Sequence, residues 1–448
     1  FLVAQDTALY FFRVGGGAAR SLALRRAPRV MGVPFVEATP ARVLWFDAER
    51  ARVLDLASGR EQPGGFDYPR PFVGLSWAGS EVRSDGRVAV VATGSGAAGE
   101  LGTGARWEVW RPEADTLVTT VLEDAPFGRP PGANWIFFSL KGDRVALAAN
   151  TSAQTLRVWS LSEGKPITPP LALPARMIYT NSRPASFSPD GTRIAAGGIN
   201  GIVRVWELAT GRVLFDLASG PQNLRFMAFS PDGGRIVTLT GGPVMRLWDG
   251  NTGQPLTDAM LFETEGALTD LNFSPDGRWL AVASGAEGAR LYDGHSLEPF
   301  GETLASPARS IRFSRDGTRI ATGNNATQAK IWDATTHQPL SEPMQHPGVR
   351  VVTAEFSPDG RYLRVETSDN YYHFWPVPPL VAGAPLPEWL LDLATICAGK
   401  RLTNTGNLEN APDAMARIDE VRRALENSAD DAPYVEWGRW FLADRATR

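Results

Sequence analysis

Short runs of alternating apolar and polar residues recur along the chain, and residues that favour turns bound each run. From Val203 to Trp206, valines alternate with Arg204 and Trp206, which places the valines on one face of a strand. The runs are rich in branched residues, as half-buried strands are. Between two runs stands Ser-Pro-Asp-Gly, in which proline presets one backbone angle and glycine accepts a positive one. The pattern predicts antiparallel hairpins closed by tight turns with a glycine bulge.

The hairpins belong to a longer repeat. Five turn glycines, separated by 42, 44, 40 and 43 residues, each precede an aromatic residue by 15 positions. A period near these values with several short strands per unit is typical of propeller blades. We expect aromatic residues at one fixed register to pack between blades rather than to bind a ligand. The five pairs are Gly191 and Trp206, Gly233 and Trp248, Gly277 and Tyr292, Gly317 and Trp332, and Gly360 and Trp375.

Weaker copies precede the strong ones. The turn at Gly86 precedes Trp110 by 24 residues, which indicates nine added residues between the second and third strands, within Gly94 to Gly104. A degraded turn at Gly142 leads to Trp159, and residues 39–61 resemble an eroded blade. We expect the strands within residues 1–17 to pair with the last blade and close the ring. The repeats predict an all-β propeller with eight blades, or alternatively seven.

The composition changes after Trp375. Residues 376–388 hold five prolines and are interpreted as a linker. Trp389, Leu393 and Ile396 then follow helical spacing between Pro387 and Gly399, and two further helical patterns come later. We predict a propeller over residues 1–376, a proline-rich linker over 377–386 and a helical tail over 387–448. The tail is interpreted as a cap on a propeller surface or, alternatively, as a docking module for a partner helix.

The bulk composition excludes several classes of partner and compartment. The chain has 45 basic and 49 acidic residues and a formal charge of −4, which argues against nucleic-acid binding. Its one cysteine, Cys397, cannot form an intrachain disulfide, so a cytoplasmic location is favoured. No apolar run reaches the roughly 18–20 residues that cross a bilayer. The first residue is Phe1 rather than methionine, and we interpret the chain as part of a longer protein.

No stretch carries the residues of a catalytic, cofactor or metal site. The sequence GSGAAG at residues 94–99 has dinucleotide-binding spacing but lacks the helix that must follow it. A nucleophile elbow and the kinase catalytic loops are missing from the sequence. The four histidines are scattered, and a single cysteine cannot complete a zinc site. We therefore expect no enzymatic activity, no cofactor and no metal.

The repeats with the consensus FSPDG…Trp resemble WD40-type propellers of the bacterial kind, over roughly Val33 to Pro376. The tail sequences PEWLLDLA and WGRWFLADRATR resemble the segment that follows such repeats in multidomain bacterial proteins, which often carry a serine/threonine kinase domain. The resemblance implies a regulatory or sensory role in signalling. The aspartate that the family places six residues before the tryptophan survives as Asp369, with Asn200 as a near match. The only Gly-His pair ends at His295 in a different loop, so we expect the family's polar relay to be mostly missing.

One constellation remains as a candidate binding site. The positions four residues before the phenylalanine of each turn open the innermost strands, so they should ring one mouth of the central channel. Arginines at three of them, with Arg350 nearby, would attract an acidic protein or peptide. In the alternative interpretation each arginine pairs with an acid of a neighbouring loop. The candidate partner-binding residues are Arg183, Arg225, Arg309, Arg350 and Asn134, and the remaining ring positions are Thr269 and Val352.

These observations predict a non-catalytic scaffold that binds proteins or peptides, within a larger bacterial signalling protein. The alternative is a propeller that gates substrate access, or senses a small ligand, for a catalytic domain outside this chain.

Overall fold

The computed structural model describes the backbone of ten strands within residues 1–134 and most of residues 135–442. After residue 134 the undescribed residues are 140–142, 149–153, 178–182, 243, 263–267, 286–287, 306, 325–326, 342, 347, 358, 370, 378–386, 399, 403–407, 412, 430–433 and 443–448. For a few further residues the backbone alone is described.

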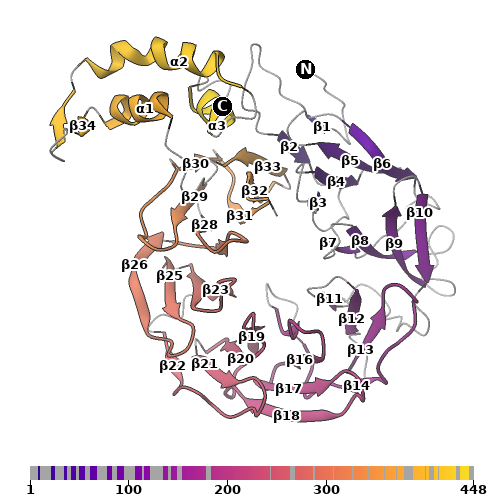
Figure 1. Ribbon diagram of the computed structural model, residues 1–448. Helices are drawn as coiled ribbons and strands as arrows, with labels where there is room; N and C mark the ends of the chain where they lie inside the picture. The colour runs from indigo at the N-terminus through magenta and orange to yellow at the C-terminus, as the bar shows by residue number, and fades with distance from the viewer. Residues whose placement is uncertain are drawn as a thin grey trace.

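The described strands before residue 377 form eight antiparallel sheets of four or five strands, arranged in a ring around a central opening (Figure 1). Each sheet is one blade, and consecutive strands along the chain run from the centre outward. The eight sheets confirm the preferred number of blades. Blade 1 contains β3 (Phe35–Glu37), β4 (Arg42–Phe46), β5 (Arg50–Asp55) and β6 (Glu61–Asp67); blade 2 contains β7 (Ala78–Val82), β8 (Val88–Gly94), β9 (Arg106–Glu113) and β10 (Thr116–Val121).

The five strong repeats and the copy before them form the other blades. Blade 3 contains β11 (Trp135–Phe138), β12 (Arg144–Ala148), β13 (Thr155–Ser160) and β14 (Leu171–Ala172); blade 4 contains β15 (Ala185–Phe187), β16 (Arg193–Gly197), β17 (Ile202–Glu207) and β18 (Val213–Ala218); blade 5 contains β19 (Leu224–Phe229), β20 (Arg235–Thr240), β21 (Val244–Asp249) and β22 (Met260–Leu261); blade 6 contains β23 (Leu268–Phe273), β24 (Trp279–Ser284), β25 (Gly288–Asp293) and β26 (Pro299–Ala305); blade 7 contains β27 (Ser310–Phe313), β28 (Arg319–Gly323), β29 (Gln328–Asp333) and β30 (Met344–Gln345); blade 8 contains β31 (Val351–Phe356), β32 (Tyr362–Thr367) and β33 (Tyr371–Pro376).

The N-terminal segment closes the ring by completing blade 8. Strand β2 (Leu22–Arg25) pairs antiparallel with β33, and β1 (Leu9–Tyr10) pairs with the outer side of β2. Closure from the N-terminus is therefore confirmed. The strand that makes the pairing, however, lies beyond residues 1–17, where the sequence placed it.

The Ser-Pro-Asp-Gly turns have the geometry that their residues predict. In blade 4 the Gly191 N–H donates to the Ser188 carbonyl over 2.9 Å, and Gly191 has a φ of +73°, which glycine adopts without strain. The Ser188 hydroxyl accepts the Arg193 N–H over 2.9 Å, and the Asp190 carboxylate accepts the Thr192 N–H over 3.0 Å. The side chains of the turn thus satisfy its backbone. The face of the propeller that carries these turns is called the turn face.

The repeated aromatics pack between neighbouring blades. Trp206 of blade 4 is 1% exposed and lies in one core cluster with residues of blade 3, including Leu156. Trp248 of blade 5 lies in the next cluster with Val203 and Val205 of blade 4. This confirms the predicted packing role and excludes these aromatics as a binding platform.

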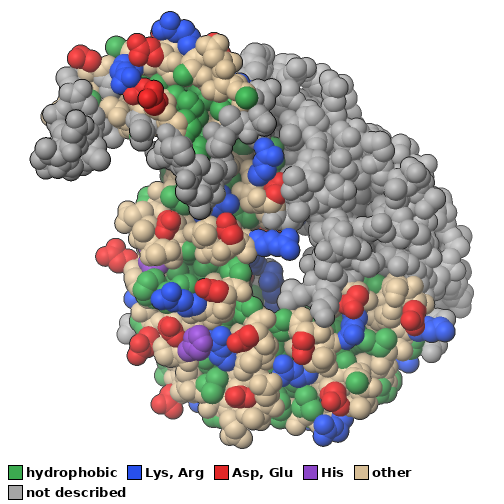
Figure 2. Space-filling view, in the orientation of Figure 1, with side chains coloured by type: hydrophobic (Ala, Val, Ile, Leu, Met, Phe, Trp, Pro, Cys, Tyr) green, Lys and Arg blue, Asp and Glu red, His purple; other side chains and the backbone are tan. Residues whose placement is uncertain are grey.

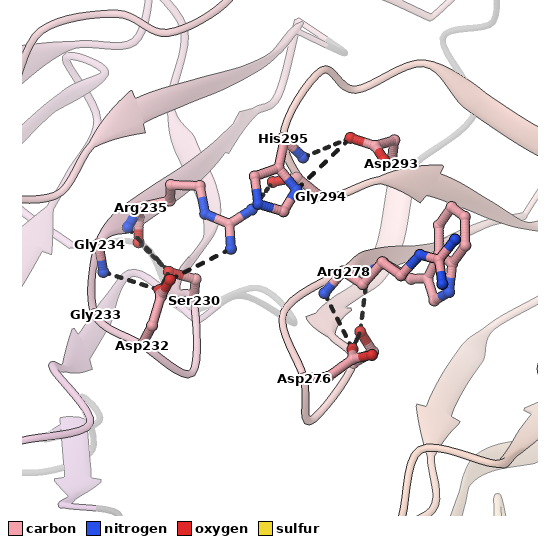
Figure 3. A network of polar contacts seen from close by, with 12 residues as sticks. Ser230, Asp232, Gly233, Gly234, Arg235, Asp276, Arg278, Asp293, Gly294 and His295 are labelled. Carbon is pink, nitrogen blue, oxygen red and sulfur yellow. Dashed lines mark hydrogen bonds and ion pairs between the residues drawn. The ribbon is translucent and has the colours of Figure 1, made fainter.

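A repeated arginine, which was not among the predicted structural residues, connects neighbouring blades on the turn face. Arg193 donates to the Gly233 carbonyl of the next blade over 2.9 Å, and Arg319 donates to that of Gly360 over 3.2 Å. Figure 3 shows the same reach by Arg235 to the Gly294 carbonyl, over 2.5 Å. These arginines stand two residues after a turn glycine, so the sequence did contain the signal.

The C-terminal helices form a small core of their own. Trp389, Leu393 and Ile396 are buried together with Val421 and Leu425, as the helical spacing predicts. In Figure 1 these helices lie outside the ring, beside β30 and β33, so they do not cover the central opening. Among the described residues no helix has the length and apolar character needed to span a bilayer. The tail contains α1 (Glu388–Ala398), β34 (Lys400–Leu402), β35 (Leu408–Asn410), the 3₁₀ helix η1 (Ala414–Arg417), α2 (Ile418–Glu426) and α3 (Val435–Leu442).

Candidate functional site

The arginines selected from the sequence lie where the innermost strands begin. Arg225 is the second residue of β19, while Arg309 and Arg350 directly precede β27 and β31. Arg183 precedes β15, and its N–H donates to the Arg225 carbonyl over 2.8 Å. Basic side chains line the central opening in Figure 2. We call Arg183, Arg225, Arg309 and Arg350 the mouth arginines.

Loops between second and third strands lie beside these arginines. The Arg309 N–H donates to the Gly323 carbonyl over 2.7 Å, and the Arg350 N–H donates to the Ser368 hydroxyl over 3.1 Å. The mouth and these loops therefore share the face opposite the turn face, as expected. Asn134 and the added loop of blade 2, residues 95–105, lie outside the described residues.

Two of the mouth arginines, Arg225 and Arg309, carry positive charge that no acid of the described residues pairs with. Arg183 and Arg350 are exposed, and Arg225 and Arg309 are half-buried. Within the described part of the chain, Arg225 and Arg309 make no ion pair. The interpretation that every mouth arginine pairs with a neighbouring acid therefore finds no support at these two positions.

Further along the innermost strands, acids and arginines do pair. The Arg312 guanidinium forms an ion pair with the Asp270 carboxylate of the neighbouring blade. In blade 8, Arg364 of β32 donates to the Glu355 carboxylate of β31, and the two residues face each other in the strand register. We call Asp270, Arg312, Glu355 and Arg364 the inner layer. These positions differ in residue type from one repeat to the next, so the spacing of the repeats does not predict the inner layer.

Glu355 is held in its charged form by arginines of several blades. Partial desolvation by the surrounding protein would by itself raise its pKa, but the charges of Arg364, Arg312 and Arg183 outweigh this effect and hold the pKa below its ordinary value. Arg183 belongs to blade 4, which lies across the ring from blade 8 (Figure 1). The field of the mouth therefore reaches across the channel.

The fold brings together two histidines that look scattered in the sequence. The rings of His346 and His373 lie 4.5 Å apart in the closing region, and His346 is 3% exposed. The neighbouring Thr367 hydroxyl donates to Asp369 over 2.6 Å, and the His346 ring meets that of Trp375 edge-on at 5.7 Å. Blade 8 therefore brings together the residue types of the relay, but the side-chain hydrogen bond that the described residues make among them is the one from Thr367 to Asp369, so the expectation of a mostly missing relay stands. We missed its histidine because glutamine, not glycine, precedes His346.

Blades 5 and 7 have a different contact of this relay, from the tryptophan to a threonine of the second strand. The Trp248 indole donates to the Thr238 hydroxyl over 2.9 Å, and Trp332 donates to Thr322 over 2.8 Å. Gly242 stands where blade 5 would need the aspartate. Among the described residues, no cluster of histidine, cysteine and acidic side chains is suited to hold a metal ion.

Comparisons with known proteins agree with this geometry. The family model described as the lipoprotein LpqB beta-propeller domain matches residues 201–322, and that of the WD domain, G-beta repeat, matches residues 185–207. The chain folds as a WD40-like β-propeller. No curated relative matches the sequence.

A solved structure supports the same fold. The computationally designed Ika8 protein aligns with a TM-score of 0.57 and 17% identity, over 77% of this chain and 95% of its own. At this identity the likeness concerns the fold alone. The two family matches connect the repeats to propellers of the WD40 and lipoprotein kinds, and WD40 domains generally bind proteins or peptides.

Proposed function

We propose that this propeller is a non-catalytic scaffold whose protein or peptide partner docks through acidic side chains at the channel mouth. The observation that carries the proposal is the contrast among repeated arginines. Arg235 is 8% exposed and donates to the next blade, whereas Arg225 and Arg309 make no ion pair among the described residues. Charge that the fold does not use internally is available to a partner, and it steers an acidic partner toward the opening.

The rigid ring supports this role. Aromatic residues and arginines join neighbouring blades at fixed registers, so the mouth arginines stand on a scaffold that keeps their positions. Loops on such a scaffold vary without disturbing the core, and binding tends to settle on them. We extend the proposal to a regulatory part of a larger bacterial signalling protein in the cytoplasm, on the basis of the resemblance of the repeats and the tail.

The test is a triple charge reversal, Arg183→Glu, Arg225→Glu and Arg309→Glu. A natural partner, isolated by pull-down and purified, should bind the folded variant at least about tenfold more weakly, because charge-assisted hydrogen bonds contribute roughly 1.5–3 kcal/mol each. Binding to the parent protein should also weaken as salt rises.

The matched control reverses three exposed basic residues away from the mouth: Lys165→Glu, Arg212→Glu and Arg315→Glu. The net charge changes equally, so this variant should keep its affinity within about twofold. An equal loss of affinity in both variants would show that only the net charge of the protein matters. Unchanged affinity of the mouth variant would refute the docking site. Circular dichroism and thermal unfolding establish that both variants are folded.

A further inference from the structure

The two acids of the inner layer are held very differently. Asp270 is 6% exposed, forms an ion pair with Arg312 and accepts the backbone N–H groups of Leu271 and Ile311 over 3.0 and 3.2 Å. These contacts fix the Asp270 carboxylate to its own blade 6 and to blade 7. Such a carboxylate cannot leave without stranding buried donors.

Glu355 has far fewer connections. Its side chain is 45% exposed, and Arg364 supplies its only hydrogen bond among the described residues. Arg364 itself is only 14% exposed. Because Arg364 is mostly buried, it can stay in place when the Glu355 side chain moves. Water can then hydrate the freed Glu355 carboxylate.

The surroundings of Glu355 favour an anion at this point of the channel. Arg364, Arg312 and Arg183 all act on its carboxylate and lower its pKa. Arg312 keeps its own partner in Asp270, and the mouth arginines add further positive charge toward solvent. One carboxylate thus sits in a field set by three blades, where a second carboxylate would compete with it.

We propose that Glu355 is an internal occupant of the arginine cluster, and that an aspartate or glutamate of the partner displaces it when an acidic loop or extended peptide enters the channel mouth. This inference rests on the proposed function and adds its mode of recognition. The partner's carboxylate takes over the hydrogen bond from Arg364, while the Glu355 side chain turns into the solvent of the channel. The ion pair between Glu355 and Arg364 weakens the binding of anions that cannot also bind the mouth arginines.

The experiment uses the full chain and a defined probe, the capped peptide (Glu-Gly)₄, with (Gln-Gly)₄ as the neutral control. Glu355→Gln removes the competing charge, and its amide oxygen still accepts from Arg364. We expect (Glu-Gly)₄ to bind this variant about tenfold more tightly than the parent, as the gain of one charge-assisted hydrogen bond implies. The matched control is Glu298→Gln, an exposed glutamate outside the channel, which should change the affinity by less than about twofold. Isothermal titration calorimetry measures both.

A second pair of variants tests the same idea if Glu355→Gln weakens the fold. Arg364→Gln removes the shared arginine and leaves Glu355 to compete for the remaining ones, so (Glu-Gly)₄ should bind several-fold more weakly. The double variant Glu355→Gln with Arg364→Gln should bind within about twofold of Arg364→Gln alone, because Glu355→Gln tightens binding only through Arg364. Non-additivity of this kind is the signature of residues that act as one unit.

The outcomes separate this inference from the proposed function. Equal tightening by Glu355→Gln and Glu298→Gln would overturn the displacement, and so would unchanged affinity in a folded Glu355→Gln or Arg364→Gln variant. If neither the parent nor Glu355→Gln binds (Glu-Gly)₄, the displacement is also overturned, while the natural partner and the triple charge reversal still decide the scaffold role. Tightening confined to Glu355→Gln and to the acidic peptide supports the displacement.

Discussion

The turn face and the channel mouth both carry repeated arginines, but they use them in opposite ways. On the turn face Arg235 is buried, and its guanidinium lies 5.9 Å from the ring centroid of Phe273 and donates to a carbonyl of the next blade (Figure 3). At the mouth, Arg225 is half-buried and makes no ion pair among the described residues. Two positions in one repeat thus separate two tasks. A satisfied arginine holds the ring together, whereas an uncompensated one is free to bind.

The largest loss of stability is expected from a substitution in the hydrophobic core between two blades, which supports both faces of the ring. Trp248→Ala opens a cavity between blades 4 and 5 and should lower the free energy of unfolding of the propeller by about 3–5 kcal/mol. Trp389→Ala empties the separate core of the tail and should leave the main unfolding transition almost unchanged. Differential scanning calorimetry distinguishes the two. Equal shifts of the main transition would show that the tail and the ring unfold as one unit.

A substitution of one arginine on each face sharpens the comparison directly. Arg235→Met keeps the length of the side chain but strands the Gly294 carbonyl, so we expect a loss of about 1–3 kcal/mol. Arg225→Met strands no hydrogen-bonding group among the described residues and should change stability by less than about 0.5 kcal/mol. Urea unfolding measures both. Similar losses would mean that the mouth arginine is structural as well.

The repeat predicted the fold because turns and packing depend on residues at fixed spacing. Gly191 adopts the positive φ of a tight turn, and Trp206 packs between two blades. Because such residues recur at a fixed spacing, the hairpins, the interblade core and the eight blades could be inferred from the sequence. The arginine of the turn face was equally regular at Arg193 and Arg235. It could have been found by asking which polar residue recurs beside the turn.

The inner layer could not be predicted in the same way. Glu355 and Arg312 occupy equivalent positions in neighbouring repeats, where other blades carry Asn272 or Ser186. Which of them meet depends on the radius of the ring and on neighbours that are distant in sequence, such as Asp270, which lies 42 residues from Arg312. The sequence therefore predicts a ring of positions, but the fold determines which charges are paired.

The closing blade should respond to mild acid more strongly than the other blades. Burial, aided by the charge of His373 and partly offset by that of Asp369, lowers the pKa of His346 to about 3 from 6.5. Between these values the unfolded chain binds a proton that the folded chain does not. The stability contributed by neutral His346 is therefore complete above about pH 6.5 and is lost as the pH falls toward 3.

At about 1.4 kcal/mol per pH unit, the loss reaches at most about 2 kcal/mol at pH 5. The variant His346→Gln should have a flatter profile of unfolding free energy against pH over this window. His295→Gln, at an exposed histidine, should follow the parent. If the slopes of all three proteins agree, the closing blade is not the acid-sensitive part of the ring.

The smallest effect is expected at the turns, in stronger acid. Burial raises the pKa of Asp190, but hydrogen bonds from the Ser188 hydroxyl and from Thr192, with the charge of Arg193, outweigh it and lower the pKa to about 2 from 3.8. Because the folded value is the lower one, this contribution is present above about pH 4 and disappears as the pH falls through 2. Asp190 is exposed, so water screens the effect and we expect less than about 1 kcal/mol.

Asp190→Asn keeps an oxygen that accepts the Thr192 N–H, so it should match the parent at pH 7 and lose less stability between pH 4 and pH 2. The control Asp258→Asn removes an exposed carboxylate that makes no hydrogen bond among the described residues, and it should unfold with the acid profile of the parent. An identical acid profile for Asp190→Asn and Asp258→Asn would show that the turn carboxylates contribute nothing beyond their surface charge.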